Sequence, residues 1–467
     1  MRFMSLTAKL DAINEFDRQP VSADRIQGSG TFVALFAGEH IAGTEFVIGP
    51  LFVAHGVTAT DLFGGLIVGN LLAVLSWAFF VAPIAVRTRL NLYWQLRKIT
   101  GPQLLFVYNI VNALMFCFLA GAMISVAATA VGLPFDMTMP GLNDRYPNSV
   151  SWVIVVGLVG AVVTGFAVLG FDRITGFSKV AWPWMLAVFV ASAVAVLQQL
   201  GVSSFGEFWL VANERIWTGV PLAGQSKFTF WHVMFFAWFC NMAMHIGMAD
   251  LTILRYARHW THGFLSAFGM YLGHFVAWVA SGILCAAALG EIAPGPIAYM
   301  GIGVTGAIAV VVAGWTTANP TLYRAGLALQ TATPNWKRWK VTVAAGAVTT
   351  TAAMFPALMM QLLDFVALYG LILMPMGVVI FADFWLLPRM GLQSYFAELH
   401  GLQFSWPAAL TWTGTLAVCA FLPMEIFFLG LPGWFLAVGF YVLFCYIQQL
   451  RKPGGIVQEV RCSGLHG

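Results

Sequence analysis

The chain has 467 residues, of which 60% are hydrophobic and 9% are charged, and its formal net charge is +4 at pH 7. Soluble globular domains carry about 25% charged residues, so this composition excludes an ordinary soluble protein and predicts a membrane protein. The apolar runs approach the roughly 20 residues that cross a bilayer as a helix, and they lack the ten-residue alternation of membrane strands. The sequence contains no GxxxxGK[ST] motif, which argues against an ATP-driven pump.

Twelve membrane spans are predicted in chain order, separated by turn signals rich in glycine and proline. The sequence therefore predicts an all-α polytopic membrane protein with twelve transmembrane helices. Residues 1–30 precede the first span and lack the apolar region of a signal peptide, so the first span is expected to direct the chain to the membrane. The predicted spans are approximately 31–54, 61–86, 102–131, 149–170, 175–199, 229–252, 263–289, 297–322, 340–356, 360–386, 405–425 and 432–450.

The distribution of basic residues predicts the orientation of these spans. The loops on the side of both termini hold twenty Lys and Arg residues, among them Arg324 after the eighth span, whereas the opposite loops hold three. Loops that face the cytoplasm carry an excess of Lys and Arg. We therefore expect a multi-pass protein of the cell membrane with both termini in the cytoplasm. The net positive charge follows from this topology and does not indicate a nucleic-acid partner.

The first span contains the polar stretch "GEHIAGTEF", with Glu39, His40 and Glu45 between apolar segments. On insertion scales, one acidic residue at the bilayer centre costs roughly 2.5–3.5 kcal/mol. Two interpretations follow. The acids are structural and paired, for example with His40 or His245, or at least one of them contacts a substrate or carries a coupling proton.

The sixth span repeats part of this pattern. His40-Ile41 is followed by Gly43 and Glu45, and His245-Ile246 is followed by Gly247 and Asp250. Many transporters consist of two inverted halves whose interrupted helices meet at the membrane midplane. We therefore expect both spans to be interrupted, around 39–45 and 241–248, with the glycines at or beside the breaks.

Five further stretches, in order along the chain, resemble one known family. They are "PVSADRIQG" (20–28), "LIVGNLL" (66–72), "RTRLNLYWQLRKITG" (87–101), "GWTTANPTLYRAGL" (314–327) and "MPMGVVIFADFWL" (374–386). Together they are similar to motifs of the nucleobase–cation symporters, the family of purine and cytosine permeases.

This resemblance implies a five-plus-five inverted-repeat core with two appended helices, and alternating access coupled to a sodium ion or a proton. The chain would then divide into a cytoplasmic N-terminal segment (1–30), a transporter core (31–390), the last two spans (391–450) and a cytoplasmic tail (451–467). No cofactor is expected beyond Na⁺ as the possible coupling ion.

The resemblance also implies a cation site between the first and eighth spans. Its ligands would be backbone carbonyls near Gly38, Ile41 and Ala313 and the hydroxyls of Thr316 and Thr317. Hard oxygen ligands suit an alkali cation. The alternative is that the adjacent threonines only hydrogen-bond to their own helix.

The family's substrate site holds a planar ring between aromatic residues of the third and sixth spans. Aligned by motif, these positions fall on Met115 and Asn241, neither of which is aromatic, although Trp238 lies within a turn of the second. The polar amide of the third span falls on Asn112. The predicted substrate site comprises Glu39, Ala42, Gly43, Glu45, Asn112, Met115, Trp238, Asn241 and His245.

The leading hypothesis is a secondary active transporter that imports a nucleobase or a related small polar nitrogenous compound by cation symport. Because the aromatic pair is missing, a cationic solute with proton coupling is a second hypothesis. A membrane haem or redox protein with His40, His245 or His274 as axial ligands, and a passive channel, remain alternatives. The sequence shows no nucleophile–base set of an enzyme, and the expected partners are a small-molecule substrate and the lipid bilayer.

Overall fold

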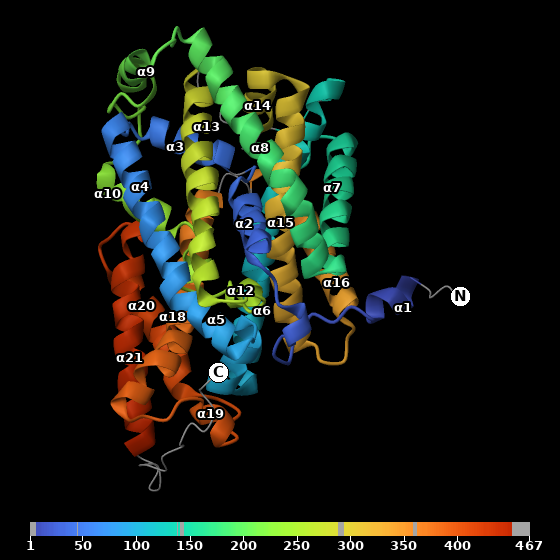
Figure 1. The fold of residues 1–467 in the computed structure, drawn as a ribbon, viewed down its shortest axis with the longest axis vertical. Coiled ribbons are helices and arrows are strands. Elements are labelled where there is room, and N and C mark those ends of the chain that lie inside the picture. Colours follow the sequence, from blue (N-terminus) through green and yellow to red (C-terminus); the bar gives the residue numbers. More distant parts are fainter. Residues whose placement is uncertain are drawn as a thin grey trace.

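The computed structural model describes residues 6–43, 45–137, 139–140, 144–287, 294–357 and 362–450. These residues form a helical bundle, and the only extended pairings among them are two isolated bridges (Figure 1). The first half of the bundle contains α2 (Ser29–His40), α3 (Glu45–Ala54), α4 (Ala59–Ser76), α5 (Ala82–Thr88), α6 (Leu92–Val131), α7 (Val150–Leu169) and α8 (Phe171–Gln199). The second half contains α10 (Phe230–Phe239), α11 (Met242–His245), α12 (Leu251–Leu254), α13 (Val276–Ala287), α14 (Pro294–Ile302), α15 (Val304–Ala332), α16 (Arg338–Ala353) and α18 (Leu362–Phe381).

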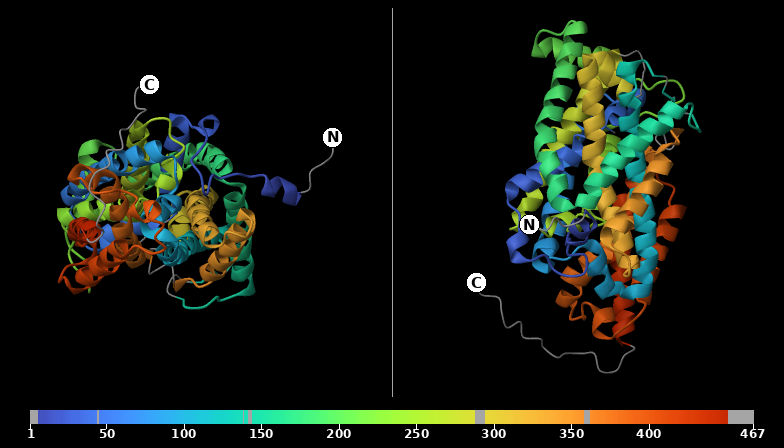
Figure 2. Two further views of the ribbon diagram at one scale, coloured as in Figure 1. Left: turned by 90° about the horizontal axis from the view of Figure 1, so that it is seen from below. Right: turned by 90° about the vertical axis from the view of Figure 1, so that its right-hand side faces the viewer.

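Shorter elements and two C-terminal helices complete the chain. The helices α20 (Trp406–Phe421) and α21 (Gly430–Leu450) pack on each other and on α18, at the side of the bundle (Figure 2). The remaining helices are α1 (Leu6–Asp11), α9 (Phe205–Val211) and α19 (Phe396–Leu399). Short 3-10 or π turns are η1 (Ala23–Arg25), η2 (Trp77–Val81), η3 (Leu133–Phe135), η4 (Ala212–Ile216), η5 (Trp260–Leu265), η6 (Phe268–Phe275), η7 (Ala382–Leu386), η8 (Pro388–Met390) and η9 (Ile426–Phe428).

The packing of the two halves is symmetric. Two contacts join the halves in a reciprocal way: α4 of the first half packs along α10 of the second, and α13 of the second half packs along α3 of the first. The long helices α6 and α15 occupy corresponding places and pack on each other, as do α7 and α16. The second span of each half thus packs against the first span of the other half. This reciprocal packing is the pattern of two interlocked repeats.

Seven helices are long and apolar enough to cross a membrane, or eight if the bent pair α2 and α3 counts as one span. The prediction of twelve spans is therefore not matched by this criterion within the described residues. The physical reasons are local. The sixth span is divided, α16 and α20 have 16 residues each, and α15 carries the polar sequence "WTTANPT" and a buried arginine.

The predicted interruptions are present in the first and sixth spans. The last hydrogen bond of α2 joins the Ile41 N–H to the Ala37 carbonyl, and α3 starts at Glu45 at an angle of 51°. In the sixth span, α10 stops at Phe239, and short turns carry the chain to α12. The left-handed residue of this second break is Met248, at a φ of 62°, and not the neighbouring glycine.

Close approach of α4 to α10 depends on small residues. A Cβ atom on Gly69 would lie 2.4 Å from the Met234 carbonyl oxygen, and one on Gly65 would lie 2.7 Å from the Val233 side chain. Small residues allow helix backbones to approach closely in membranes, where van der Waals packing drives association.

The N-terminal segment folds into one end of the bundle, here called the basal end, which also holds α5 and α19 (Figure 1). Glu15 is buried there and accepts hydrogen bonds from the Tyr323 hydroxyl at 2.6 Å and from the Phe171 N–H at 3.3 Å. The Arg255 guanidinium, also buried, donates to the backbone carbonyls of Glu15 and Phe16 at 2.7 Å each. The segment therefore closes the basal end through polar contacts with α8, α15 and the loop after α12.

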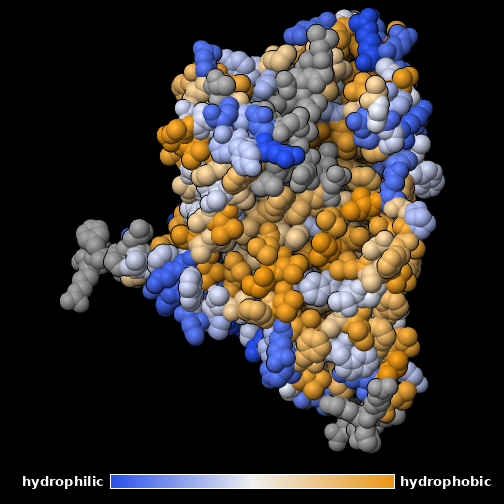
Figure 3. Space-filling model, turned by 180° about the vertical axis from the view of Figure 1, so that it is seen from behind, coloured by the Kyte–Doolittle hydropathy of each residue, from blue (hydrophilic) through white to orange (hydrophobic). Residues whose placement is uncertain are grey.

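Apolar side chains form a broad band across the middle of the surface, and hydrophilic residues gather toward both ends (Figure 3). Large hydrophobic residues are also exposed on outward helix faces, for example Ile154 and Leu158 on α7 and Val190 and Val194 on α8. A band of this kind suits contact with lipid.

Candidate functional site

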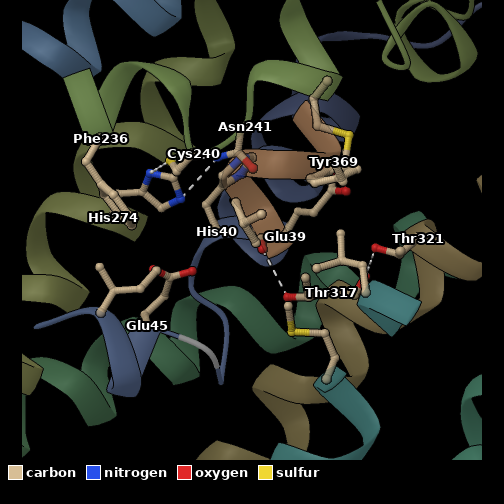
Figure 4. A pocket seen from close by; sticks show the side chains of 15 residues that line it. Glu39, His40, Glu45, Phe236, Cys240, Asn241, His274, Thr317, Thr321 and Tyr369 are labelled. Atoms are coloured by element: carbon tan, nitrogen blue, oxygen red, sulfur yellow. Dashed lines mark hydrogen bonds between the residues drawn. The ribbon is translucent and has the colours of Figure 1, made fainter. Parts of the chain in front are cut away.

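The two broken helices surround a small polar cavity of about 60 Å³ (Figure 4). A buried water needs roughly 10–15 Å³ by this measure, so the space has room for about four to six waters. The cavity is lined by Glu39, His40, Glu45, Ile48, Leu119, Met123, Phe236, Cys240, Asn241, Met244, His274, Thr317, Thr321, Val366 and Tyr369. Side chains of α2, α3, α6, α10, α15 and α18 thus meet at one place.

A buried ion cluster connects this cavity to both breaks. The Arg324 guanidinium on α15 contacts both carboxylate oxygens of Glu39, one of them at 3.2 Å, and its Nη2 donates to Asp250 Oδ1 at 2.5 Å. The three side chains are 0%, 7% and 1% exposed, respectively. Asp250 also accepts from the Trp77 indole N–H at 2.6 Å. One cation therefore compensates two acids, one from each broken helix.

The cluster corrects the predicted position of Arg324, which was assigned to a loop. The helix α15 continues to Ala332, so Arg324 lies inside it. The predicted span ended near residue 322, whereas the helix accommodates Pro320 and continues for a further ten residues. Arg324 is the partner of Glu39, in place of the suggested histidines.

Glu45 begins α3, where the helix dipole favours a negative charge. Its carboxylate accepts a hydrogen bond from the Trp278 indole N–H, and its backbone carbonyl accepts one from the Ser281 hydroxyl at 2.7 Å. Both donors belong to α13. Glu45 is thus held against α13 while it lines the cavity.

Three imidazoles lie beside these acids. The His40 Nδ1–H donates to the Phe36 carbonyl at 2.7 Å, and the His274 Nε2 accepts from the Asn241 amide at 3.3 Å. The rings of His40 and His274 are 4.9 Å apart (Figure 4). His245 does not line the cavity, and its Nε2–H donates to the Trp238 carbonyl at 2.9 Å.

The structure brings together only part of the predicted substrate site. Glu39, Glu45 and Asn241 line the cavity, whereas Asn112 and Met115 do not. The residues Ala42 and Gly43 form the backbone of the first break without lining the cavity, and Trp238 also lies outside it.

The displaced residues have other contacts. The Asn112 amide is fully buried between hydroxyl groups, accepting from Tyr93 at 3.0 Å and donating to Tyr108 at 3.2 Å. Met115 packs against the hydrophobic core. Trp238 donates from its indole N–H to the Ser76 hydroxyl at 3.1 Å. In α6, the cavity is reached instead by Leu119 and Met123, one to three helical turns farther along.

The cavity nevertheless has aromatic walls that the motif alignment missed. Phe236 lies one turn before the predicted sixth-span position, and Tyr369 comes from α18. His274 stacks on Trp278 at 4.4 Å. Phe236 lies five residues before Asn241, outside the three- or four-residue helical spacing from the predicted position, and no sequence motif singled out Tyr369.

The predicted cation ligands lie at the contact between α2 and α15. The Thr317 hydroxyl donates to the Glu39 carbonyl oxygen at 3.0 Å and to that of Ala313 at 3.2 Å, and the Thr316 hydroxyl donates to the latter at 3.0 Å. Both threonines therefore make the hydrogen bonds to their own helix that the alternative interpretation expects, and Thr317 in addition joins α15 to α2. The carbonyls of Gly38 and Ile41 belong to the end of α2, where the helix ladder stops. These are neutral oxygen atoms at a helix break, which is the kind of group that coordinates an alkali cation.

Two interrupted helices that enclose a cavity, between interlocked repeats, are the arrangement found in inverted-repeat membrane transporters. The chain has the fold of the nucleobase–cation symporters. It superposes on Mhp1, a nucleobase-cation-symport-1 family transporter in a closed conformation with bromovinylhydantoin bound, with a TM-score of 0.71, 18% identity and coverage of 94% of this chain and 97% of that one.

Other solved structures give the same fold. An inward-facing conformation of Mhp1 matches with a TM-score of 0.67, 15% identity and coverage of 92% and 93% of the two chains. A substrate-bound, outward-open Na⁺-coupled sialic acid symporter matches with a TM-score of 0.68, 12% identity and coverage of 94% and 93%. No family profile and no curated protein sequence matches the chain.

Proposed function

We propose that the protein is a secondary active transporter that imports a small polar nitrogenous solute, a nucleobase or a related compound, by cation symport and alternating access. The observation that carries this proposal is the polar cavity at the breaks of both discontinuous helices, beside the oxygen-rich contact of α2 and α15. Solved cation-coupled symporters with the same fold support it.

The cavity chemistry favours a substrate that donates hydrogen bonds. The Glu45 carboxylate and the Glu39 carboxylate are acceptors, and Asn241 adds an amide. Phe236 and Tyr369 offer apolar and π surfaces for a small ring or an ammonium group. An N–H-rich compound of few atoms satisfies these groups without a large rearrangement.

A compact cationic solute with proton coupling is the second candidate function. The ion cluster favours it, because a cation that enters beside Glu39 offers that carboxylate a second partner while Arg324 retains Asp250. The redox alternative gains no support, since the cavity beside His40 and His274 is far smaller than the roughly 300–1,000 Å³ of pockets for drug-sized ligands.

For the coupling ion, we propose Na⁺ coordinated by the carbonyls of Gly38, Ile41 and Ala313 and the hydroxyls of Thr316 and Thr317. The two hydroxyl groups already lie within hydrogen-bond distance of a carbonyl oxygen, so a small rotation would turn their lone pairs toward a shared cation. Substrate would then bind at the neighbouring cavity through Glu39, Glu45 and Asn241.

The test is a thermal-unfolding screen of the purified protein with nucleobases, hydantoins, vitamins and small amines, each in sodium and in potassium buffer. A ligand at 100 times its dissociation constant adds about 2.7 kcal/mol of stability. Hits are then assayed for uptake into proteoliposomes. Uptake that saturates and requires a sodium or proton gradient supports symport, whereas uptake that ignores both gradients would identify a channel.

A further inference from the structure

A second cavity, distant from the polar cavity, lies at the basal end of the bundle. It is an open groove of about 690 Å³, lined by residues of η2, α5, the start of η5, the end of α18, η7 and η8. Its walls include Phe79, Phe80, Trp260, Phe381 and Trp385. Phe79 is 49% exposed, and the other four aromatic residues are half-buried. We refer to it as the basal groove.

Two arginines lie at the edge of the basal groove. The Arg87 guanidinium is 4.9 Å from the centre of the Trp385 ring, and the Arg389 guanidinium is 5.3 Å from the same centre. Both arginines are exposed. Within the described part of the chain, neither forms an ion pair, and no carboxylate lines the groove.

The two arginines therefore place like charges against one indole without a compensating anion. Cation–π contact orients each guanidinium, but it does not compensate the repulsion between the two charges. It also leaves most of their N–H donors without an acceptor. An anion with several oxygen atoms would relieve the repulsion and accept these hydrogen bonds. A phosphodiester group matches the guanidinium fork in charge and geometry.

The apolar walls specify the rest of the ligand. A free phosphate would occupy the arginine edge and leave the aromatic groove empty, whereas a lipid would place its acyl chain along the aromatic walls and its headgroup at the arginines. Basic pockets between helices at the cytoplasmic face of membrane proteins bind anionic lipids in this way. The basic-residue distribution predicts that the basal end faces the cytoplasm.

We propose that the basal groove binds an anionic phospholipid, with its phosphate at Arg87 and Arg389 and an acyl chain against the aromatic residues. This site is independent of the proposed transport function, because it shares no lining residue with the polar cavity. Bound lipid would bridge α5 and the end of α18.

The proposal is tested by native mass spectrometry of the full-length protein titrated with dioleoyl phosphatidylglycerol or dioleoyl phosphatidylcholine. Wild type is expected to prefer phosphatidylglycerol, and Arg87→Gln/Arg389→Gln to bind it about thirtyfold more weakly, since each arginine near an anionic headgroup contributes about 1 kcal/mol. The matched control is Arg97→Gln, which removes an exposed arginine that lies 4.5 Å over Trp94 at the same end but outside the groove. It should leave the preference unchanged.

The charge-preserving variant Arg87→Lys/Arg389→Lys shows whether loss of binding reflects loss of charge or of folding, and it should retain most of the preference. Equal binding of the two lipids by wild type, or an unchanged preference in the double glutamine variant, would overturn the proposal. The proposal would also be overturned if millimolar glycerol phosphate competed as effectively as the lipid itself. That result would identify a site for phosphate without an acyl chain.

Discussion

Replacement of Arg324 by methionine removes the one cation shared by two buried acids. Met has a similar length and fills much of the same volume, so packing changes little. The Glu39 and Asp250 carboxylates then remain 7% and 1% exposed, without a positive partner.

Breaking a buried ion pair by removal of one partner costs about 3–5 kcal/mol, because the other charge stays buried and unpaired. Here two charges are left, of which Asp250 keeps the Trp77 indole N–H as a donor. We therefore expect Arg324→Met to lower the free energy of unfolding by at least that amount. Glu39→Gln should cost less, at most the roughly 1.5–3 kcal/mol of a hydrogen bond to a charged group, since it leaves a balanced pair of Arg324 and Asp250.

The assay is unfolding by SDS in mixed micelles, followed by far-ultraviolet circular dichroism, with the midpoint as the measure of stability. The triple variant Arg324→Met/Glu39→Gln/Asp250→Asn removes all three charges and should recover most of the loss, because neutral replacements of a buried cluster are often well tolerated. The reasoning fails if Arg324→Met unfolds within 1 kcal/mol of wild type, or if the triple variant is less stable than Arg324→Met.

Three further predictions address the other parts of the site. Thr317→Ala removes the hydroxyl that joins α15 to the end of α2, so half-maximal uptake should need at least tenfold more sodium while Thr317→Ser behaves like wild type; unchanged ion dependence in the alanine variant would exclude sodium at this site. Glu45→Gln keeps an acceptor for the neighbouring indole but loses the charge, so affinity for a cationic ligand should fall at least tenfold with little change in the melting temperature; equal affinity in a binding titration would make this acid structural. Gly69→Ala places a methyl group against the α10 backbone and should destabilise the protein by about 1–3 kcal/mol in the SDS assay. The control Gly64→Ala, whose Cβ would meet only a ring edge at 3.5 Å, should be nearly neutral. Equal effects of the two variants would contradict the close-packing argument.

The architecture could be predicted from the sequence because membrane helices are recognisable by their apolar composition and their length. The breaks were also predictable, since glycine next to polar residues in mid-span marks an unwound segment. Glu39 and Glu45, both named in the predicted substrate site, line the cavity, and their role in binding stays a prediction. The positions along α6 of the residues that line the cavity were not predictable from the sequence. A motif alignment along a long helix such as the part of α6 after the kink at Gly101 can shift by one or two turns without changing which face is apolar, and this shift separates Asn112 from Leu119.

Arg324 could not be assigned from pattern alone for a different reason. A basic residue near the predicted end of a span is normally a loop residue, and only the three-dimensional contact with the acids of two other spans explains why it is buried. The tyrosine of α18 was missed because an isolated aromatic residue in an apolar helix carries no sequence signal.

The buried position of Glu15 has a practical consequence for work with shortened chains. A polar stretch before the first membrane helix looks dispensable, and trimming it is a common step before crystallisation. In this protein, trimming to residue 17 would remove the acceptor of the Tyr323 hydroxyl and both carbonyls that receive the Arg255 guanidinium. The truncated protein is expected to be less stable at the basal end, so low stability of such a preparation would be an artefact of trimming and not a property of the untrimmed chain.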